Sequence, residues 1–355
     1  MSGWGRGAGG GGGGGWGAGG GGAAGSSGGA SGTSATQGNH NRDLQLPETP
    51  SGVISSVRWT PPGCVNLMVG ATSWDKSVRV WGVQTQEDNS GLVTAMKADP
   101  IGIQNSEQPI LSVDFAKDGR CFYAGCDRAG MMWDLQSGQT QQVAAHEAPI
   151  CCARFQEDGA AGPMLVTSGW DAKVRFWDVR QPSGTPAKEE NFGAPVHDMD
   201  LTSAPLATFL CGRKCVVYDL QNMAIVNEST PVAKASYAMR RVANLADRSA
   251  SYACTVDGRV VSLPVAAGQT SEQFKAHGGA DPRNAKLFDA YQVNFISAHP
   301  VTNRTVFTGA SDGLIRCFDL QAKGRFYEFP PRRHNGEPLP VSCGALSPGG
   351  TMLAY

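Results

Sequence analysis

Short runs of alternating apolar and polar residues, separated by glycine- and aspartate-rich turns, fill most of the chain. Residues 53–59 alternate in this way, and further short strands are predicted at residues 67–72, 78–81 and 110–115. A period of two is typical of strands that bury one face. Between two such runs lies Asp118-Gly119, a dipeptide typical of tight hairpin turns. The pattern therefore predicts an all-β chain of short antiparallel strands.

One arrangement of turn and strand recurs along the chain. Asp171 lies in a predicted turn, and Trp177, six residues later, ends a strand and is followed by Asp178. The same pairing recurs as Asp75 with Trp81, Asp127 with Trp133, Asp257 with Leu263, Asp312 with Phe318, and, without the aspartate, Gly212 with Tyr218. The closing residues at 81, 133, 177, 218, 263 and 318 lie 52, 44, 41, 45 and 55 residues apart. A period of roughly 40–45 residues ending in Trp-Asp predicts a WD-repeat β-propeller.

The repeats predict one domain, a seven-bladed propeller over residues 43–355 whose last blade is incomplete. The seventh copy begins at residue 340, and only two of its strands, the second at residues 351–355, are present. We expect either a fragment or a defective blade, with a strand at Leu44 and Leu46 supplying its outer edge. Residues 1–42 are nearly all Gly, Ala and Ser, which predicts a disordered tail. Trp4 and Trp16 in this tail leave open a second possibility, weak aromatic contacts in a multivalent assembly.

Composition and charge exclude several classes of protein. The 30 Lys and Arg residues nearly balance 31 Asp and Glu, so no overall charge demands a nucleic acid or a membrane partner. No apolar run approaches the roughly 18 residues that span a bilayer, and the N-terminus lacks the apolar core of a signal peptide. The ten cysteines form no CxxC pair. We interpret them as buried, reduced thiols of an intracellular protein that binds no metal.

The motifs that resemble catalytic sites fit the repeat better than an enzyme. Gly309-Ala310-Ser311-Asp312-Gly313 matches the G-x-S-x-G pattern, but a nucleophile elbow needs a helix after its turn, and here a strand follows. The turn aspartates recur once per blade, too far apart to act as a pair. The sequence also lacks a P-loop and an H-E-x-x-H motif. We therefore expect a protein that is not an enzyme and that needs no cofactor or metal.

The third repeat resembles other WD repeats in a set of four residues. In such proteins a His before the first strand, a hydroxyl in the second, the turn Asp and the closing Trp are joined by hydrogen bonds. His146, Thr167 or Ser168, Asp171 and Trp177 match these positions. A half-buried carboxylate must be hydrogen-bonded, so we expect this set to tie a loop to its blade.

Residues 321–334 interleave basic and aromatic side chains, among them Arg325, Phe326 and Tyr327. Basic groups neutralise phosphates and aromatic rings stack on unpaired bases, which is how single-stranded RNA is commonly held. An outer strand followed by a solvated loop explains the same pattern, and the residues alone leave both readings open.

Several longer stretches resemble one family, the nuclear-pore mRNA export factors of the Rae/Gle class. The matching stretches are residues 71–75, 78–81, 146–150, 169–171, 256–260, 274–277, 299–300 and 311–313. They are spread over residues 43–355. A mitotic-checkpoint relative of the Bub class shares several of them, whereas the entry segment at residues 46–61 and residues 78–84 favour the export factors.

The resemblance implies a scaffold that grips a short, acidic nucleoporin segment, the GLEBS motif, across one face. Arg259 matches the contact arginine of the family by position, and a turn arginine in water is the alternative explanation. Lys234 is a weaker match, because residues 233–240 depart from the family's Leu-Lys-x-Gln-x-Arg-Cys run. The resemblance also implies a surface for single-stranded RNA at Phe274, Phe318, Asp319 and Arg325.

We accordingly predict a non-enzymatic scaffold of the nuclear pore that supports mRNA export. It would be a monomeric propeller within a heteromeric complex, without a membrane partner, in the nucleus, at the nuclear pore and in the cytoplasm. The alternative is a mitotic-checkpoint adaptor that binds kinetochore or kinase segments of the GLEBS type through the same groove.

Overall fold

The computed structural model describes residues 43–89, 91, 93–157, 162–180, 184–202, 204–230, 238–266, 268–281, 284–322 and 324–355, with the backbone alone at 281 and 285–287. These residues form strands and turns and contain no helix. The tail predicted over residues 1–42 and the candidate contact Lys234 both lie outside the described residues.

The strands assemble into six four-stranded antiparallel sheets and three two-stranded ones. The first three four-stranded sheets contain β1 (Ile54–Trp59), β2 (Met68–Ser73), β3 (Ser77–Glu87) and β4 (Val93–Asn105); β5 (Ile110–Phe115), β6 (Cys121–Gly125), β7 (Ala129–Trp133) and β8 (Thr140–Ala145); and β9 (Ile150–Gln156), β10 (Met164–Gly169), β11 (Lys173–Asp178) and β12 (Lys188–Asn191). The next three contain β13 (Val196–Asp200), β14 (Leu206–Cys211), β15 (Lys214–Asp219) and β16 (Ala224–Ser229); β17 (Met239–Asn244), β18 (Ser251–Thr255), β19 (Arg259–Leu263) and β20 (Gln273–Lys275); and β23 (Val293–Ala298), β24 (Thr305–Ala310), β25 (Ile315–Asp319) and β26 (Gly324–Phe329). The two-stranded sheets pair β21 (Gly278–Asp281) with β22 (Asn284–Ala290), β27 (Arg333–His334) with β28 (Glu337–Pro338), and β29 (Ala345–Leu346) with β30 (Leu353–Ala354).

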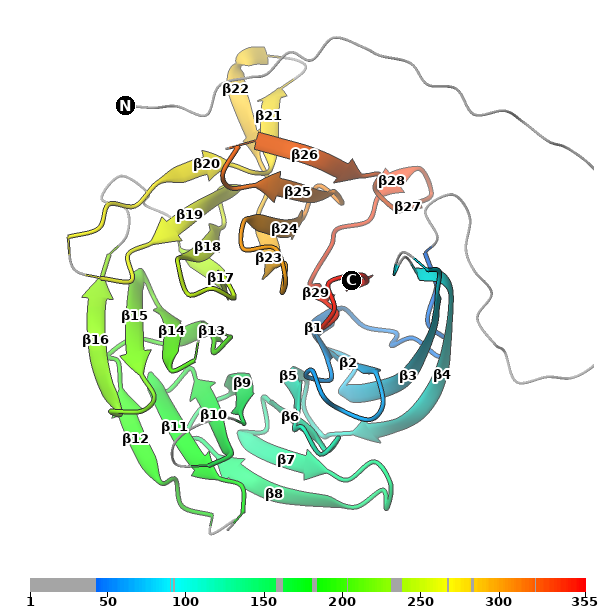
Figure 1. The fold of residues 1–355 in the computed structure, drawn as a ribbon, viewed down its shortest axis with the longest axis vertical. Coiled ribbons are helices and arrows are strands. Elements are labelled where there is room, and N and C mark those ends of the chain that lie inside the picture. The colour runs from blue at the N-terminus through cyan, green and yellow to red at the C-terminus, as the bar shows by residue number, and fades with distance from the viewer. Residues whose placement is uncertain are drawn as a thin grey trace, which may run out of the picture.

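The six four-stranded sheets are the blades of a ring (Figure 1). The first strand of each blade lies next to the centre, and the fourth lies at the rim. Every blade is an up-and-down meander, so neighbouring strands in sequence are neighbours in space. The predicted all-β WD-repeat propeller is therefore confirmed.

The repeat aspartates build the turn between the second and third strands of their blades. Asp75, Asp171 and Asp312 each accept a hydrogen bond from the backbone N–H two residues later, at 3.0–3.1 Å. This Asx-type bond lets the intervening residue adopt a left-handed conformation. Ala172 does so at φ 66°. Gly258 of the fifth blade is also left-handed, at φ 79°, but there the N–H of Arg259 donates to Thr255 Oγ1 at 3.1 Å instead of to Asp257. At Gly258 a Cβ would lie 2.0 Å from the carbonyl oxygen of His277, so only glycine fits there.

The core lies between adjacent blades, and each closing residue packs toward the blade before it. Trp177 joins a buried cluster with Phe122 and Met132 of the second blade. Tyr218 joins one with Phe176 of the third blade, with the two rings stacked 5.5 Å apart. Because both faces of a blade are covered, the second strands are buried almost throughout. The closing residue is thus part of the contact that holds the ring together.

The seventh blade is not confirmed as predicted. In the described residues, six blades have four strands, and β29 with β30 forms a two-stranded sheet between the sixth blade and the first. Figure 1 places this sheet on the inner side of a wide gap in the ring. Leu44 and Leu46 form no strand, but they pack on the first blade with Met352 and Ala354.

Candidate functional site

One face of the ring carries the turns between second and third strands, and we call it the aspartate-turn face. On this face His146 Nδ1 lies 2.9 Å from Asp171 Oδ2, and its Nε2 lies 2.8 Å from Thr167 Oγ1. Trp177 Nε1 donates to the same Thr167 oxygen at 2.8 Å. The set suggested by the WD-repeat resemblance is therefore present, with Thr167 rather than Ser168 as its hydroxyl.

A second set of this kind belongs to the sixth blade and escaped the sequence analysis. His277 Nδ1 lies 3.0 Å from both Asp312 carboxylate oxygens, and its Nε2 lies 2.9 Å from Thr308 Oγ1. Phe318 replaces the tryptophan and cannot donate to Thr308. The two-stranded sheet β21–β22 is inserted between His277 and the first strand of the blade, which lengthens the His-to-Asp separation from 25 to 35 residues. The sequence signal was the histidine itself, which lies before the inserted sheet rather than directly before β23, the first strand of the blade.

The turn aspartates of the first two blades are also hydrogen-bonded, but by other donors. Asp75 accepts hydrogen bonds from Ser51 and Ser77. Burial favours the protonated form of Asp75, but these hydrogen bonds outweigh it and lower its pKa to about 2. Asp127 accepts from Ser106, and Trp133 Nε1 is buried with no hydrogen-bond partner among the described residues. The repeat thus keeps the turn carboxylate bonded while the donors vary.

Replacing His277 by Gln should remove a pH-dependent part of the stability. Burial lowers the pKa of His277 below 6.5, against the opposing effect of Asp312. A lowered histidine pKa gives stability that is complete above the unfolded pKa of 6.5 and is lost as the pH falls. In urea titrations from pH 7.5 to 5, we expect the wild-type advantage over His277→Gln to shrink, by at most about 1.4 kcal/mol per pH unit. An advantage that stays constant over this range would contradict the assignment. Asp312, with its own pKa lowered below 3.8, titrates outside this window.

Arg259, the contact residue that the resemblance implies, belongs to the aspartate-turn face. It begins β19, directly after the turn of the fifth blade, and its side chain is 31% exposed. Arg259 Nε pairs with Asp257 Oδ2 at 2.7 Å, which holds the guanidinium at the aspartate-turn face. Trp74 and Trp170 precede the turn aspartates of the first and third blades, and both are about half exposed. This face therefore combines a positioned cation with exposed aromatic side chains.

The four residues suggested as an RNA surface do not share one environment. Phe274 and Phe318 are only 6% and 4% exposed, and their rings pack 4.9 Å apart in the core between the fifth and sixth blades. Asp319 accepts hydrogen bonds from the backbone N–H groups of Gln321 and Ala322 at the β25–β26 turn. Arg325 is exposed and paired with Glu328. Phe274 also helps to line a surface cavity of about 470 Å³ together with Tyr252 and Leu320.

Two other aromatic side chains, both on the outer strand β26, are exposed and could stack on a base. Phe326 and Tyr327 of β26 are 62% and 52% exposed. They adjoin Arg325, so the basic-aromatic stretch keeps a surface character although Phe318 is buried. The β25–β26 turn lies at the opposite end of the third strand from the aspartate turn. The two candidate surfaces therefore lie toward opposite faces of the ring.

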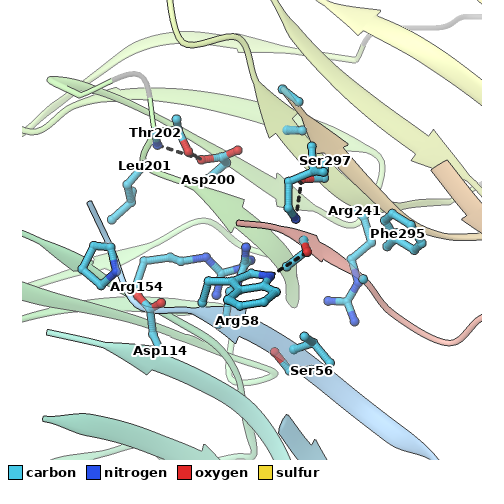
Figure 2. A pocket seen from close by; sticks show the side chains of 18 of the residues that line it. Ser56, Arg58, Asp114, Arg154, Asp200, Leu201, Thr202, Arg241, Phe295 and Ser297 are labelled. Atoms are coloured by element: carbon cyan, nitrogen blue, oxygen red, sulfur yellow. Dashed lines mark hydrogen bonds between the residues drawn. The ribbon is translucent and has the colours of Figure 1, made fainter. Parts of the chain in front are cut away.

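A central cavity of about 330 Å³ is lined by the inner strands (Figure 2). Its charged side chains include some from five successive blades: Arg58 from β1, Asp114 from β5, Arg154 from β9, Asp198 and Asp200 from β13, and Arg241 from β17. Burial raises the pKa of Asp114 to about 6, although the charge of Arg58 opposes the shift. The signs alternate around the ring, which limits the cost of burying each charge.

The cavity side chains also complete the hydrogen bonding of the inner strands. Asp114 Oδ2 accepts the Phe155 N–H of the next blade at 2.8 Å, and Asp200 Oδ2 accepts the Asn244 N–H at 2.9 Å. The same kind of bond links Ser112 to Ala153, Asp198 to Val242 and Ser297 to Leu346. Inner strands have one edge without a strand neighbour, so these side chains supply acceptors that a sheet would otherwise provide. The polar side chains that line the cavity are thus explained by the hydrogen bonds that join neighbouring blades.

No cluster of three or more metal-ligating side chains occurs in the part of the chain that the structure describes. Within the same ranges there is no helix of the length and apolarity needed to cross a membrane. The ten cysteines are all free thiols, and most are buried.

The fold and the turn chemistry define a WD-repeat β-propeller. The family model for the WD domain, G-beta repeat, matches residues 44–82, 99–134 and 138–178. The chain is 31% identical over 324 residues to "mRNA export factor GLE2" of Chaetomium thermophilum, covering 91% of this chain and 85% of that protein. It is 28% identical to "Poly(A)+ RNA export protein" of Schizosaccharomyces pombe, covering 91% and 86%. The chain belongs to this family of WD-repeat mRNA export factors.

Solved structures support the fold at greater distance. "Structure of U3-55K" superposes with a TM-score of 0.68 at 14% identity, covering 89% of this chain and 91% of that one. At this identity the likeness concerns the fold alone.

Proposed function

We propose that the chain is a non-enzymatic scaffold that binds an acidic nucleoporin segment of the GLEBS type on its aspartate-turn face. The observation that carries the proposal is the position of Arg259, held at this face by Asp257 at 2.7 Å. A carboxylate of the peptide would exchange places with, or add to, Asp257. Trp74 and Trp170, exposed on the same face, offer apolar area for an extended peptide.

Relatives named as mRNA export factors support a role in which the bound nucleoporin brings the scaffold to the nuclear pore. The protein would then act in the nucleus, at the pore and in the cytoplasm, as a single propeller within a heteromeric complex. A checkpoint adaptor would use the same face for kinase segments, but the names of the relatives do not favour it.

Peptide capture tests this assignment. Immobilised protein should bind a synthetic GLEBS-type nucleoporin segment at least tenfold more tightly than the corresponding segment of a checkpoint kinase, measured by interferometry at fixed salt. Tighter binding of the kinase segment would favour the adaptor, and binding of neither segment would remove the peptide-scaffold proposal. The contribution of Arg259 is taken up in the Discussion.

We also propose that single-stranded RNA binds beside β26. The exposed Phe326 and Tyr327 next to Arg325 support this surface, because base stacking on an aromatic ring contributes about 1–3 kcal/mol per base. The cavity that Phe274 lines lies between the fifth and sixth blades and would receive a neighbouring group of the RNA.

Replacing Phe326 by Ala should weaken binding of a fluorescein-labelled oligouridylate about 5- to 150-fold, the range that 1–3 kcal/mol implies. Arg325→Glu should weaken it further and reduce its dependence on salt. Tyr291→Ala is the matched control, because Tyr291 is an exposed aromatic residue in the loop before the sixth blade. Equal losses in the Phe326 and Tyr291 variants, measured by fluorescence anisotropy, would show that β26 is not the RNA surface.

A further inference from the structure

Arg58 is an exception among the charged side chains of the central cavity. Arg154 and Arg241 both pair with Asp198, at 3.5 and 3.7 Å, and both donate to backbone carbonyl groups. Arg58 of β1 is partly buried, but its Nε is fully buried and has no hydrogen-bond partner among the described residues. Buried donors in folded proteins are nearly always hydrogen-bonded. Arg58 can therefore bind an acceptor that comes from outside the chain.

The strands beside β1 place a carboxylate on only one side of Arg58. On that side lies β5 with Asp114, and Figure 2 shows both side chains among those that line the cavity. Asp114 is also engaged elsewhere, since its Oδ2 accepts the Phe155 N–H at 2.8 Å. On the other side lies β29, and residues 343–347, which line the cavity there, are all uncharged. The ring thus leaves Arg58 less well compensated than the other two arginines.

Two hydroxyl groups add donors to the same cavity. Ser112 Oγ accepts the Ala153 N–H at 3.0 Å, and Ser297 Oγ accepts the Leu346 N–H at 3.4 Å. Because each oxygen acts as an acceptor in these bonds, its hydrogen remains to donate. Both serines line the cavity. The lining therefore suits a ligand that presents oxygen acceptors.

The cavity opens on the face opposite the aspartate turns. The inner strands begin at the aspartate-turn face, because Ile54 at the start of β1 pairs with Ser73, just before the turn of the first blade. The lining continues past the other ends of the inner strands, where it includes Pro62 and Thr202. Both of these residues are exposed. A ligand can therefore enter without crossing the face assigned to the peptide.

Volume and charge limit the kind of ligand. The cavity of about 330 Å³ is near the lower end of the roughly 300–1,000 Å³ that is typical of small-molecule sites. Its ionisable lining has three arginines against four carboxylates, together with one histidine: Arg58, Arg154, Arg241, Asp114, Glu157, Asp198, Asp200 and His299. A phosphate ester carries about 1.5 to 2 negative charges at pH 7, whereas a carboxylate carries one. The balance of charge therefore favours a carboxylate.

We propose that the central cavity binds a small organic acid that carries one carboxylate and a neighbouring hydrogen-bond donor. The carboxylate accepts hydrogen bonds from Arg58, whose planar fork of donors matches two carboxylate oxygens. The donor, a hydroxyl or an ammonium group, binds Asp114 on the adjacent inner strand. Trp59 and Phe295 also line the cavity and offer apolar area to the rest of the molecule. The proposal does not depend on peptide capture at the aspartate-turn face.

Four small probes test the ligand class by saturation-transfer NMR titrations of the purified protein at fixed ionic strength. L-Lactate has a carboxylate with a hydroxyl, L-alanine has one with an ammonium, propionate lacks the donor, and glycerol 3-phosphate replaces the carboxylate by a phosphate. Lactate or alanine should bind at least tenfold more tightly than propionate and glycerol 3-phosphate, and the tighter of the two identifies the donor. Binding of neither, or equal binding of propionate or glycerol 3-phosphate, would overturn the proposal.

Variants of Arg58 locate the binding. Arg58→Gln should weaken binding of the better probe at least tenfold. Arg120→Gln is the matched control, because Arg120 lies in the β5–β6 turn on the same face, outside the cavity, where it pairs with Asp118 at 2.8 Å. Arg58→Lys keeps the charge but loses the fork, so it should bind with intermediate affinity, and it carries the test if melting curves show that Arg58→Gln is unfolded. Equal affinities in the Arg58 and Arg120 variants would place the acid elsewhere and overturn the proposal.

Discussion

Replacing Trp177 by Ala should lower the free energy of unfolding by about 3–5 kcal/mol, the range measured for large aromatic residues in cores. The Trp177 side chain is 3% exposed and lies between the second and third blades. Its truncation removes apolar contacts with both blades and leaves Thr167 without the donor at 2.8 Å. Chemical denaturation followed by circular dichroism measures the loss.

Trp170 provides the matched control for this prediction. It lies seven residues earlier in the same blade but is 46% exposed. Trp170→Ala should change stability by no more than about 0.5 kcal/mol, as is usual for surface substitutions. Trp177→Phe should retain most of the packing and lose the hydrogen bond, as in the sixth blade, which has Phe318 at this position. Equal losses in the two alanine variants would contradict the role given to the closing residue.

Replacing Arg259 by Glu should weaken capture of the GLEBS-type peptide by about 1–3 kcal/mol, or about 5- to 150-fold in Kd. The change removes a cation from the aspartate-turn face and places a second carboxylate beside Asp257, which now lies 2.7 Å from the guanidinium. An acidic peptide would then meet two negative groups. Interferometry at two salt concentrations measures the effect, which should be smaller at high salt.

Two further variants separate charge from geometry. Arg259→Lys keeps the charge but loses the planar fork of donors, so it should fall between wild type and Arg259→Glu. Lys97→Glu changes the same charge on β4, at the rim, where Lys97 forms an exposed pair with Asp99. This control should bind the peptide as wild type does. Unchanged binding in Arg259→Glu, with the protein folded, would remove Arg259 from the contact surface.

The repeat made the blades predictable because its chemistry is local. An aspartate that bonds the N–H two residues later, and a closing aromatic six residues later, can be recognised in one short stretch. His277 was harder to assign, because the inserted β21–β22 sheet separates it from the blade whose aspartate it bonds. The burial of Phe318 and Phe274 was not predicted either. Alternation shows that two faces differ, but in a propeller both faces of a blade can be covered, so it does not identify an exposed ring.

The hydrogen bonds around the central cavity could not be predicted from one repeat. Asp114 and Phe155 lie 41 residues apart, and Asp200 and Asn244 lie 44 residues apart. These hydrogen bonds depend on how one blade packs against the next, and the residue types alone do not indicate that packing. The number of blades was also difficult to predict. β29 and β30 are too short to show whether a seventh blade forms.

The bonds between inner strands have a consequence for how the ring can be divided. The acceptor lies on one blade and the N–H group on the next, so a blade removed from its neighbour would keep its own ladder but leave central donors without partners. Each such donor, if buried, costs about 1–3 kcal/mol. A fragment cut at a blade boundary therefore has inner-strand N–H groups without acceptors. A fragment that ends within a blade has the same unpaired N–H groups and a broken strand ladder as well. The smallest piece of this protein that satisfies its own backbone is accordingly larger than the repeat that its sequence displays.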